Sequence, residues 1–595
     1  LTPFCLEGLT AQHPGQLIYL VDQATGRTTT PFHIPFREPG ARRREVFGPG
    51  YAIFHKELGD LETELTVFVV PDQPLAVKLL TVRNRGMRPL TLRVTAYAEM
   101  VLGELALDTR GRLAAHQVPG LEALFFTNPD NDFHKGQAFV AMSLPADATE
   151  TVRSRALGGP DRDLGNPVLA ETGAADPAQP DDGARVAALA GTLHVAPGGE
   201  ESMSLVLGQA RHLETAEALV REFRPLPAAF AALVRARRFW AETLGVMRVQ
   251  TGRPEFDRLV NVWLPYQALT ARLWGRTGPN QRSGAFGFRD QLQDVLPLIT
   301  LHPDLARRQI LLHAAQQFPE GDIMQWWHQS WEGKTGLGMR NYASDPHLWL
   351  PYLVLHYIRG AGDFAILDER IPFLEGRPIP RGAEGCVFAP RPSRDADTLY
   401  GHCLRAINLT LRRMGQHGLP RMGTGDWNDG LSAVGPKKRG ESVWLGFFLY
   451  HVLTGFAELA GRREGEAARE RLLRKAHALR PALEAMRRGK RFVRAVTDDG
   501  REMLFADALT SSWSAISGAA DFETALAAVE DGLAALEKEN LVLLLTPAFD
   551  EDSDPYPGRL AEYPPGVREN GGQYSHGASW LVDALAGLAD SAAAA

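Results

Sequence analysis

Apolar and polar residues alternate over much of residues 1–214. The segments LETELTVFVV (61–70), LAVKLLTVRNRG (75–86) and LTLRVTAYAEMVLG (90–103) each show this period of two, and turn residues separate them. An alternating period places successive side chains on opposite faces of a strand. Many short strands joined by turns that contain Gly, Pro or Asn indicate a β-sandwich. We therefore predict a β-sandwich domain at residues 1–214.

The hydrophobic period becomes helical beyond the sandwich. Residues 215–250 are amphipathic, and we predict them to be a helical linker. Helical patterns then follow one another across residues 251–595, separated by long polar and aromatic loops. This arrangement favours a ring of paired helices whose loops form a site at one end. The most apolar segment, 442–461, is predicted to be a buried core helix rather than a membrane span.

Composition narrows the range of partners. The 64 basic and 71 acidic residues give a net charge of −7, so there is no basic surplus for a nucleic-acid backbone. Three scattered cysteines, Cys5, Cys386 and Cys403, show neither a disulfide framework nor metal-ligand spacing. Residues 1–15 lack the basic start and apolar run of a signal peptide. We expect no nucleic-acid partner, no metal and a reducing, cytoplasmic location.

Polar loops at the ends of apolar helices carry the candidate chemistry. Each combines a carboxylate, a Trp or Tyr, and an Arg or His, in the ranges 276–294, 320–349, 417–435, 436–444 and 562–580. Aromatic faces stack on sugar rings, and carboxylates and arginines bind hydroxyl groups, so this mixture is typical of a saccharide site. A nucleotide site would need a glycine loop between a strand and a helix, which this sequence lacks.

The loop HGLPRMGTGDWNDGLSAVG (417–435) places Asp426 and Asp429 on either side of Trp427 and Asn428. A carboxyl group beside a tryptophan is partly desolvated, which raises its pKa and lets it stay protonated near neutral pH. Such a group can donate a proton to the leaving oxygen of a glycoside. The alternative is that either aspartate merely caps a helix. The other loop carboxylates available for this chemistry are Asp290, Glu441 and Glu569.

Five motifs occur in one order along the second half of the chain. They are SGAFGFRDQLQD, WLPY before VLHY, HGLPRMGTGDWNDG, GESVWLGFFL and PPGVRENGGQYSHGASW. This half resembles glycoside hydrolase family 94, the inverting β-glucoside phosphorylases. The resemblance is closest to the 1,2-β-oligoglucan phosphorylases and to the phosphorylase-like module of cyclic β-1,2-glucan synthases. YAEMVLG and ALFFTNPDNDFHKGQAFVAM extend it into the first half.

The resemblance implies an N-terminal β-supersandwich, a helical linker and an (α/α)6 barrel with the site at the barrel mouth. It implies that inorganic phosphate attacks the anomeric carbon while Asp429 protonates the departing oxygen. Trp427 and Asp290 would line the sugar pocket, and Arg276 and His576 match positions associated with phosphate. The further predicted substrate contacts are Arg289, Trp327, Asp426, Glu441, Glu569 and Gln573.

Two requirements accompany these implied roles. Asp426 is expected chiefly to hold the loop, because the two acids need not do the same job. The carboxyl group of Asp429 must face the cavity and must not be locked against an arginine. No cofactor is expected beyond inorganic phosphate as a co-substrate, and no carboxylate base is needed, because phosphate is already an anionic nucleophile.

Departures from the family pattern keep alternatives open. The residues before Phe288 favour the β-1,2-glucan branch over cellobiose. The start LTPFCLEG and the end DSAAAA suggest a family domain truncated at both ends. One alternative is an inverting β-glucan hydrolase with Glu569 as base. Another is a non-catalytic glucan-binding module of a larger, membrane-embedded synthase, with this segment on the cytoplasmic side. The resemblance also suggests a homodimer that binds a β-glucan oligosaccharide and phosphate.

Overall fold

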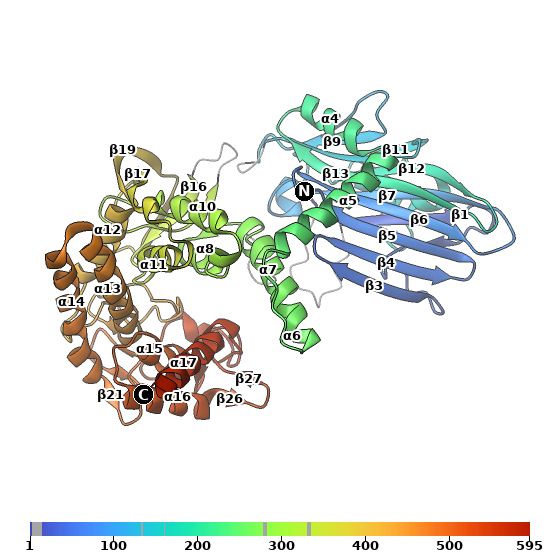
Figure 1. Ribbon diagram of the computed structural model, residues 1–595. Coiled ribbons are helices and arrows are strands. Elements are labelled where there is room, and N and C mark those ends of the chain that lie inside the picture. The colour runs from blue at the N-terminus through green and yellow to red at the C-terminus, as the bar shows by residue number, and fades with distance from the viewer. Residues whose placement is uncertain (3–14, 132–134, 160, 278–282, 330–334, 595) are drawn as a thin grey trace. The chain divides into compact units, whose positions relative to one another are not determined.

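The computed structural model describes residues 1–2, 15–131, 135–159, 161–277, 283–329 and 335–594. The chain forms two compact units, Leu1–Gln267 and Ala268–Ala595 (Figure 1). The first unit is built mainly of strands and the second mainly of helices. The predicted order of a β-sandwich followed by a helical domain is therefore confirmed.

Two antiparallel sheets make up most of the first unit. One has five strands in the order β11-β12-β7-β1-β2, and the other has eight in the order β3-β4-β5-β6-β13-β10-β9-β8. The strands are β1 (Gln16–Asp22), β2 (Thr28–Thr29), β3 (Arg42–Gly48), β4 (Tyr51–Leu58), β5 (Leu61–Val69), β6 (Leu75–Asn84), β7 (Leu90–Met100), β8 (Ala114–Gln117), β9 (Ala123–Thr127), β10 (Gln137–Met142), β11 (Ala148–Val152), β12 (Arg185–Val195) and β13 (Glu200–Ala210).

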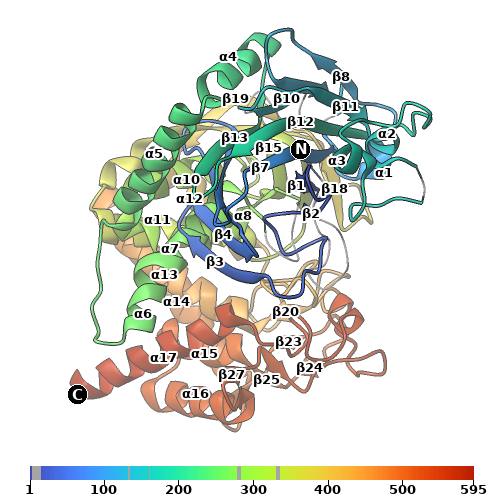
Figure 2. The same ribbon diagram turned by 90° about the vertical axis from the view of Figure 1, so that its right-hand side faces the viewer.

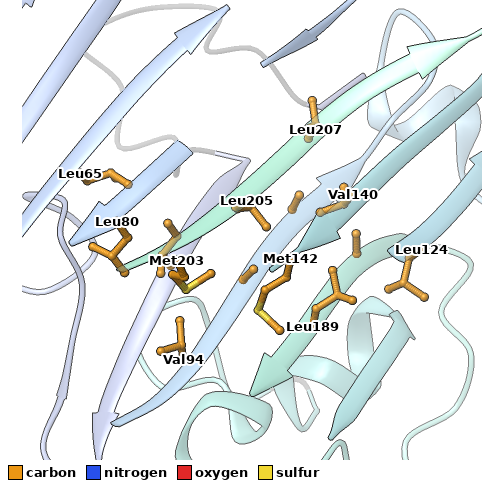
Figure 3. Packing of buried hydrophobic residues seen from close by; sticks show 14 of the residues in the cluster. Leu65, Leu80, Val94, Leu124, Val140, Met142, Leu189, Met203, Leu205 and Leu207 are labelled. Atoms are coloured by element: carbon orange, nitrogen blue, oxygen red, sulfur yellow. The ribbon is translucent and has the colours of Figure 1, made fainter. Parts of the chain in front are cut away.

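The main core of the first unit lies between the two sheets. Leu80 of β6, Val94 of β7 and Leu189 of β12 meet there, all of them buried (Figure 3). The other face of β6 is also buried, because Val77 and Leu79 pack in a second cluster with the helices that cover this sheet. A strand buried on both faces needs apolar residues at successive positions, which explains why the period of two fades in LAVKLL.

Short helices cover the outer faces of both sheets. α4 (Leu213–Phe223) and α5 (Leu226–Leu244) pack on the eight-stranded sheet. α2 (Arg153–Leu157) and α3 (Val168–Thr172) cover the outer face of the five-stranded sheet. The remaining helices of this unit are α1 (Ala106–Thr109), α6 (Pro254–Arg258), η1 (Leu259–Trp263) and α7 (Leu264–Gln267). The segment 215–250, predicted as a linker, therefore contains α5 and all but the first two residues of α4, and residues 251–267 belong to the first compact unit.

Among the described residues of the second unit, more lie in helices than in strands. The helices are η2 (Ala268–Trp274), α8 (Phe288–Asp294), α9 (Leu298–Leu301), α10 (Pro303–Ala314), η3 (Pro346–Leu348), α11 (Trp349–Ala361), η4 (Phe364–Asp368), α12 (Leu399–Arg412), α13 (Val443–Glu464), α14 (Glu466–Glu484), α15 (Ala508–Ile516), α16 (Phe522–Leu536), η5 (Arg559–Glu562) and α17 (Ser575–Ala594). α13 packs against α14, and α15, α16 and α17 lie side by side (Figure 2).

Helix α13 is apolar around most of its circumference. It is long and apolar enough to cross a membrane by length and composition, but 83% of its most apolar window is buried inside the protein. Its N-terminus is capped by Ser442, whose hydroxyl oxygen accepts a hydrogen bond from the Leu445 amide at 3.1 Å. The prediction of a buried core helix at 442–461 is confirmed.

Short strands occur within the second unit, where the sequence pattern predicted only helices and loops. The main sheet has the order β14-β15-β16-β18, and β17 pairs with β19. The larger strands are β14 (Phe286–Gly287), β15 (Met324–Gln329), β16 (Thr335–Asn341), β17 (Arg370–Glu375), β18 (Gly385–Phe388) and β19 (Arg391–Thr398). Two-residue strands complete the set: β20 (Glu441–Ser442), β21 (Arg487–Arg488), β22 (Arg491–Phe492), β23 (Ala495–Val496), β24 (Glu502–Met503), β25 (Ala506–Asp507), β26 (Glu537–Lys538), β27 (Leu541–Val542) and β28 (Leu545–Thr546).

Candidate active site

The loop 417–435 is held in one conformation by glycines and by Asp426. Gly423 has φ +63°, and a Cβ there would lie 2.0 Å from the carbonyl oxygen of Tyr342, so only glycine fits. The Asp426 carboxylate accepts a hydrogen bond from the Asn428 amide at 3.0 Å. The Asn428 side chain in turn accepts one from the Gly430 amide at 3.1 Å. Asp429 lies within the second of these turns, and its side chain is exposed.

Asp426 belongs to a closed ionic network. Arg494 donates from Nη1 and Nη2 to the two Asp426 oxygens at 2.6 and 2.8 Å, and its Nε lies 2.9 Å from Asp507 Oδ2. The Ser442 hydroxyl also donates to Asp426 at 2.6 Å. Burial alone would raise the pKa of Asp426, but Arg494 and the hydrogen bonds reverse the shift and lower it. Asp426 is 0% exposed, so the predicted substrate contact is wrong and only its loop-holding role remains.

Asp429 belongs to an open network around Arg289. Arg289 Nη2 lies 2.7 Å from Asp429 Oδ2. Its Nη1 donates to Asp345 Oδ1 and to the carbonyl oxygen of Asp426, both at 2.9 Å. The Asp345 side chain is 0% exposed, whereas that of Asp429 is 56% exposed. The same arginine therefore holds one buried carboxylate and one that opens outward.

A cavity of about 470 Å³ lies in front of Asp429. Its wall is formed by η2, the segment that follows it, strand β14, the start of α8, strand β15 and the loop 417–435. Its charged and amide side chains are Arg272, Arg276, Arg289, Asp290, Gln291, Gln325 and Asp429. Both signs of charge thus line one hollow of a size that accommodates a sugar unit together with a small anion.

The expected environment of Asp429 is met only in part. Its carboxyl group faces the cavity, as required, and Gln325 Nε2 donates to its Oδ1 at 3.4 Å. Contrary to the second requirement, Arg289 contacts its other oxygen. Desolvation nevertheless raises the pKa of Asp429, with Asp290 and Glu569 acting in the same direction and Arg289 opposing them.

Asp290 and Arg289 are positioned by the first turn of α8. The Asp290 carboxylate folds back over Gly287, where a Cβ would lie 2.1 Å from Asp290 Oδ2. Arg272 Nη2 lies 3.6 Å from Asp290 Oδ1, and its Nε donates to Asp294. Arg272 was not predicted, and no local pattern pointed to it, because it lies in η2 whereas Arg276 follows the end of that helix with φ +48°.

Arg276 lies in the cavity wall without a carboxylate partner among the described residues. Its guanidinium donates to the carbonyl oxygens of Leu273, Trp274 and Gly284 at 2.9 to 3.0 Å. It also lies 4.0 Å over the ring of Phe286. Desolvation lowers the pKa of Arg276, which means that its charge is incompletely compensated by its surroundings.

Two neighbouring tryptophans of β15 have opposite environments. Trp327 is 1% exposed and stacks on Phe286 with ring centroids 5.1 Å apart, so the predicted substrate contact at Trp327 is wrong. Trp326, on the opposite face of the strand, lines the cavity together with His328. Successive side chains of a strand point to opposite faces, and only one of two adjacent tryptophans can therefore reach the site.

Glu441 also has a structural role. It is 1% exposed and accepts hydrogen bonds from His417 Nδ1 at 2.8 Å and from the amide of Leu419 at 3.1 Å. It thereby closes the turn at the start of the loop 417–435. Because both carboxylate oxygens are engaged inside the protein, the predicted substrate contact at Glu441 is wrong.

The C-terminal candidates Glu569, Gln573 and His576 are not among the residues that line the cavity, and two side chains of their segment pack on Trp427. Trp427 is 7% exposed and packs edge-on against Tyr574 and His576, with centroids 5.4 and 5.3 Å apart. Burial lowers the pKa of His576 to about 4, so its imidazole is neutral at pH 7. Glu569 accepts from the Tyr574 hydroxyl at 3.4 Å, and Gln573 is exposed.

A metal site has no support among the described residues, which contain no group of three or more His, Cys, Asp or Glu side chains arranged to hold an ion. The polar side chains of the cavity are mainly arginines, carboxylates and amides. Such groups bind hydroxyl groups and oxyanions through hydrogen bonds and charge.

Comparison with known families assigns both halves of the chain. Residues 239–594 match the glycosyl hydrolase 94 superfamily catalytic domain, and residues 1–225 match the glycosyl hydrolase 94 supersandwich domain. The chain belongs to glycosyl hydrolase family 94. A solved bacterial glucoamylase complexed with acarbose has the same fold, with a TM-score of 0.54, 10% identity, and coverage of 90% of this chain and 76% of that chain. The predicted class, a supersandwich followed by an (α/α)6 barrel, is confirmed.

Several curated relatives belong with this family. The cyclic β-(1,2)-glucan synthase NdvB of Rhizobium meliloti is 36% identical over 98% of this chain and 21% of its own length. The solabiose phosphorylase of Paenibacillus borealis is 28% identical over 96% of this chain and 72% of its own length. The N,N'-diacetylchitobiose phosphorylase of Vibrio furnissii is 24% identical over 98% and 75%. The chain thus spans about a fifth of NdvB.

Proposed function

We propose that this family 94 chain catalyses the inverting phosphorolysis of β-glucosidic linkages in β-1,2-glucan. The products would be α-glucose 1-phosphate and a glucan shortened by one unit. The similarity to NdvB supports β-1,2-glucan as the substrate, and the phosphorylases among the relatives support phosphate as the nucleophile. Inorganic phosphate is a co-substrate, and the proposal needs no further cofactor.

One observation carries the proposal: a carboxyl group that faces the cavity and an arginine without a carboxylate partner, among the described residues, line the same hollow. Asp429 supplies the carboxyl group and Arg276 the guanidinium. Arg276 is held by three backbone carbonyls, so its position is fixed before any anion binds. A desolvated arginine of this kind favours a phosphate oxyanion, which compensates its charge.

In the proposed reaction a phosphate oxygen forms a bond to the anomeric carbon as the glycosidic C–O bond breaks. Asp429 gives its proton to the departing oxygen and becomes a carboxylate. Arg289, already within 2.7 Å of Asp429, stabilises that negative charge as it develops. Attack from the face opposite the leaving group inverts a β-glucoside to an α-phosphate. His576, neutral at pH 7, contributes at most a hydrogen bond to phosphate.

Incubation with linear β-1,2-glucan, with and without phosphate, tests the proposal. We expect α-glucose 1-phosphate to form only with phosphate and Asp429→Asn to abolish it, and the anomer is read by ¹H and ³¹P NMR. A β-1,4-glucan serves as the linkage control. Glucose released without phosphate would indicate the hydrolase alternative, in which Glu569 acts as base. Glucan binding without any product would indicate a binding module.

The hydrolase alternative has little support in the described geometry. Glu569 is not among the residues that line the cavity, and its side chain contacts Tyr574 and Arg568. A base that activates water needs to face the sugar from the side opposite the acid. We therefore place phosphorolysis first.

The similarity to a much longer synthase supports a wider proposal. We propose that this segment acts within a larger glucan synthase, on its cytoplasmic side, and that it trims or remodels the glucan there. Size-exclusion chromatography with light scattering of the isolated segment tests the accompanying expectation of a homodimer.

A further inference from the structure

The Arg289 guanidinium is shared between two carboxylates, and the buried one has no role in the proposed reaction. We propose that Asp345 is a positioning residue: it binds one edge of Arg289 so that only the other edge reaches Asp429, and it thereby keeps Asp429 available as the proton donor. This inference rests on the proposed function and adds a residue to its site.

Both carboxylate oxygens of Asp345 accept hydrogen bonds from neighbouring side chains. Its Oδ2 accepts a hydrogen bond from the indole of Trp349 at 2.8 Å, and its Oδ1 accepts from Arg289 Nη1 at 2.9 Å. Asp345 is 0% exposed and Trp349 1% exposed, so neither side chain has room to turn away. Asp345 therefore fixes the plane of the guanidinium.

The chain next to Asp345 is bonded to the loop that carries Asp429. The amide and hydroxyl of Ser344 both donate to the carbonyl oxygen of Gly425, at 3.0 and 3.1 Å. Arg289 Nη1 donates to the carbonyl oxygen of the next residue, Asp426, at 2.9 Å. Asp345 and Arg289 thus brace the backbone just before Asp429, and this sets the distance between guanidinium and carboxyl group.

Because Arg289 is shared between Asp345 and Asp429, the charge of Asp345 affects the ionisation of Asp429. Two arginines, Arg289 and Arg494, face the carboxylates of Asp345, Asp426, Asp429 and Asp507. Arg494 is bound by Asp426 and Asp507, and among the described residues Arg289 is the arginine that forms ion pairs with both Asp345 and Asp429. Asp290 and Glu569 add further negative charge around Asp429. An arginine whose charge is already partly compensated by Asp345 stabilises an ionised Asp429 less than a free arginine would.

The protonation of Asp345 agrees with this role. Burial raises the pKa of Asp345 to about 6, and Arg289 and Trp349 act against that rise. At pH 7 to 8 the group is therefore mainly a carboxylate and binds Arg289 as a charged partner. If it were neutral, both its own repulsion of Asp429 and its hold on the Arg289 charge would be lost. Each of these losses lowers the pKa of Asp429.

Asp345→Asn tests the proposal, because it keeps the size of the side chain and one of its two hydrogen-bond acceptors but removes the charge. A proton donor works only below its pKa, so a lower Asp429 pKa moves the alkaline limb of the kcat profile to lower pH. We expect a shift of about one pH unit and a kcat at pH 8 about tenfold lower. The KM for phosphate should change less than about twofold, since Asp345 does not reach the cavity.

Asp322→Asn is the matched control. Asp322 also forms a buried pair with an arginine of the second unit, Arg340, at 2.7 Å, with both side chains below 10% exposed. Its loss should lower stability and leave the shape of the pH profile unchanged. Trp349→Phe is the second variant: it removes the indole donor, makes Asp345 easier to protonate, and should shift the limb in the same direction by less. An unshifted profile in both Asp345→Asn and Trp349→Phe overturns the proposal.

Direct titration separates this inference from the proposed function. In protein labelled with ¹³C at aspartate carboxyl groups, the Asp429 resonance is assigned by its absence in Asp429→Asn. We expect its midpoint about one pH unit lower in Asp345→Asn than in the wild type. If the wild type forms no glucose 1-phosphate, the proposed reaction fails but this shift still decides the role of Asp345. An equal midpoint in both proteins refutes it.

Discussion

Two arginines of the second unit, Arg494 and Arg289, each bind two aspartates. They differ in how exposed those aspartates are. Arg494 is 1% exposed, with partners Asp426 and Asp507 at 0% and 3%. Arg289 is 11% exposed, and its partners are Asp345 at 0% and Asp429 at 56%. The same pairing therefore serves as an internal brace in one case and as the wall of a cavity in the other.

The closed network joins three parts of the chain that the helices alone leave separate. Asp426 lies in the loop 417–435, Ser442 caps α13 and Asp507 caps α15. Arg494 binds Asp426 and Asp507 at once, so the loop is tied to the starts of two helices. The closed network also helps to hold Asp429 in place, because Asp429 lies only three residues beyond Asp426. The position of Asp429 at the cavity thus depends on Arg494, which does not line the cavity.

The largest expected effect comes from removing Arg494, the cation of the closed network. Arg494→Met should lower the free energy of unfolding by about 3–5 kcal/mol, because it leaves two buried carboxylates without their cation. Urea unfolding followed by tryptophan fluorescence measures this change. Arg42→Met is the control: Arg42 is 88% exposed and lies 3.9 Å from Glu57, and its loss should have no measurable effect. Equal stability of Arg494→Met and the wild type would show that the closed network is not a brace.

Replacing each of the two loop aspartates separately tests the difference between the closed and the open network. Asp429→Asn should reduce kcat by about 10²–10⁴-fold, the range for loss of a general acid, and leave stability nearly unchanged because its side chain is exposed. Asp426→Asn should instead destabilise the protein, since Arg494 would lose its main partner. Steady-state kinetics and urea unfolding of both variants give the comparison. Retained turnover in Asp429→Asn would exclude it as the proton donor.

The sequence motif located the loop but could not assign the roles within it. Asp426 and Asp429 look alike in DWND, and the partner that separates them, Arg494, lies 68 residues beyond Asp426. Glu441 was misassigned for a similar reason, because the backbone amides that bind it are presented only once the loop 417–435 has closed on α13. Hydrogen bonds that depend on tertiary structure leave no local pattern in the chain.

The fold was predictable wherever a period extended over many residues. The long strand β7 and the long helix α14 each repeat one period over at least 11 residues. The short strands β14 to β19 were missed because segments of two to eight residues show too few repeats to distinguish a strand from a loop. Their partners, as in the pairing of Phe286 with Trp327, are also distant in sequence. These missed strands carry part of the cavity wall.

The smallest expected effect concerns the adjacent tryptophans of β15. As with the two arginines, one of them faces the cavity and the other is buried in the core. Trp326→Ala should lower kcat/KM for glucan about tenfold, because a half-buried indole in the cavity wall offers a stacking face to sugar. Trp326→Phe should recover most of this loss, since it restores an aromatic face, and neither variant should alter stability much. Trp327→Ala should have the opposite profile, with lost stability from an emptied core position next to Phe286. If Trp326→Ala binds and turns over glucan as the wild type does, the sugar does not lie against β15.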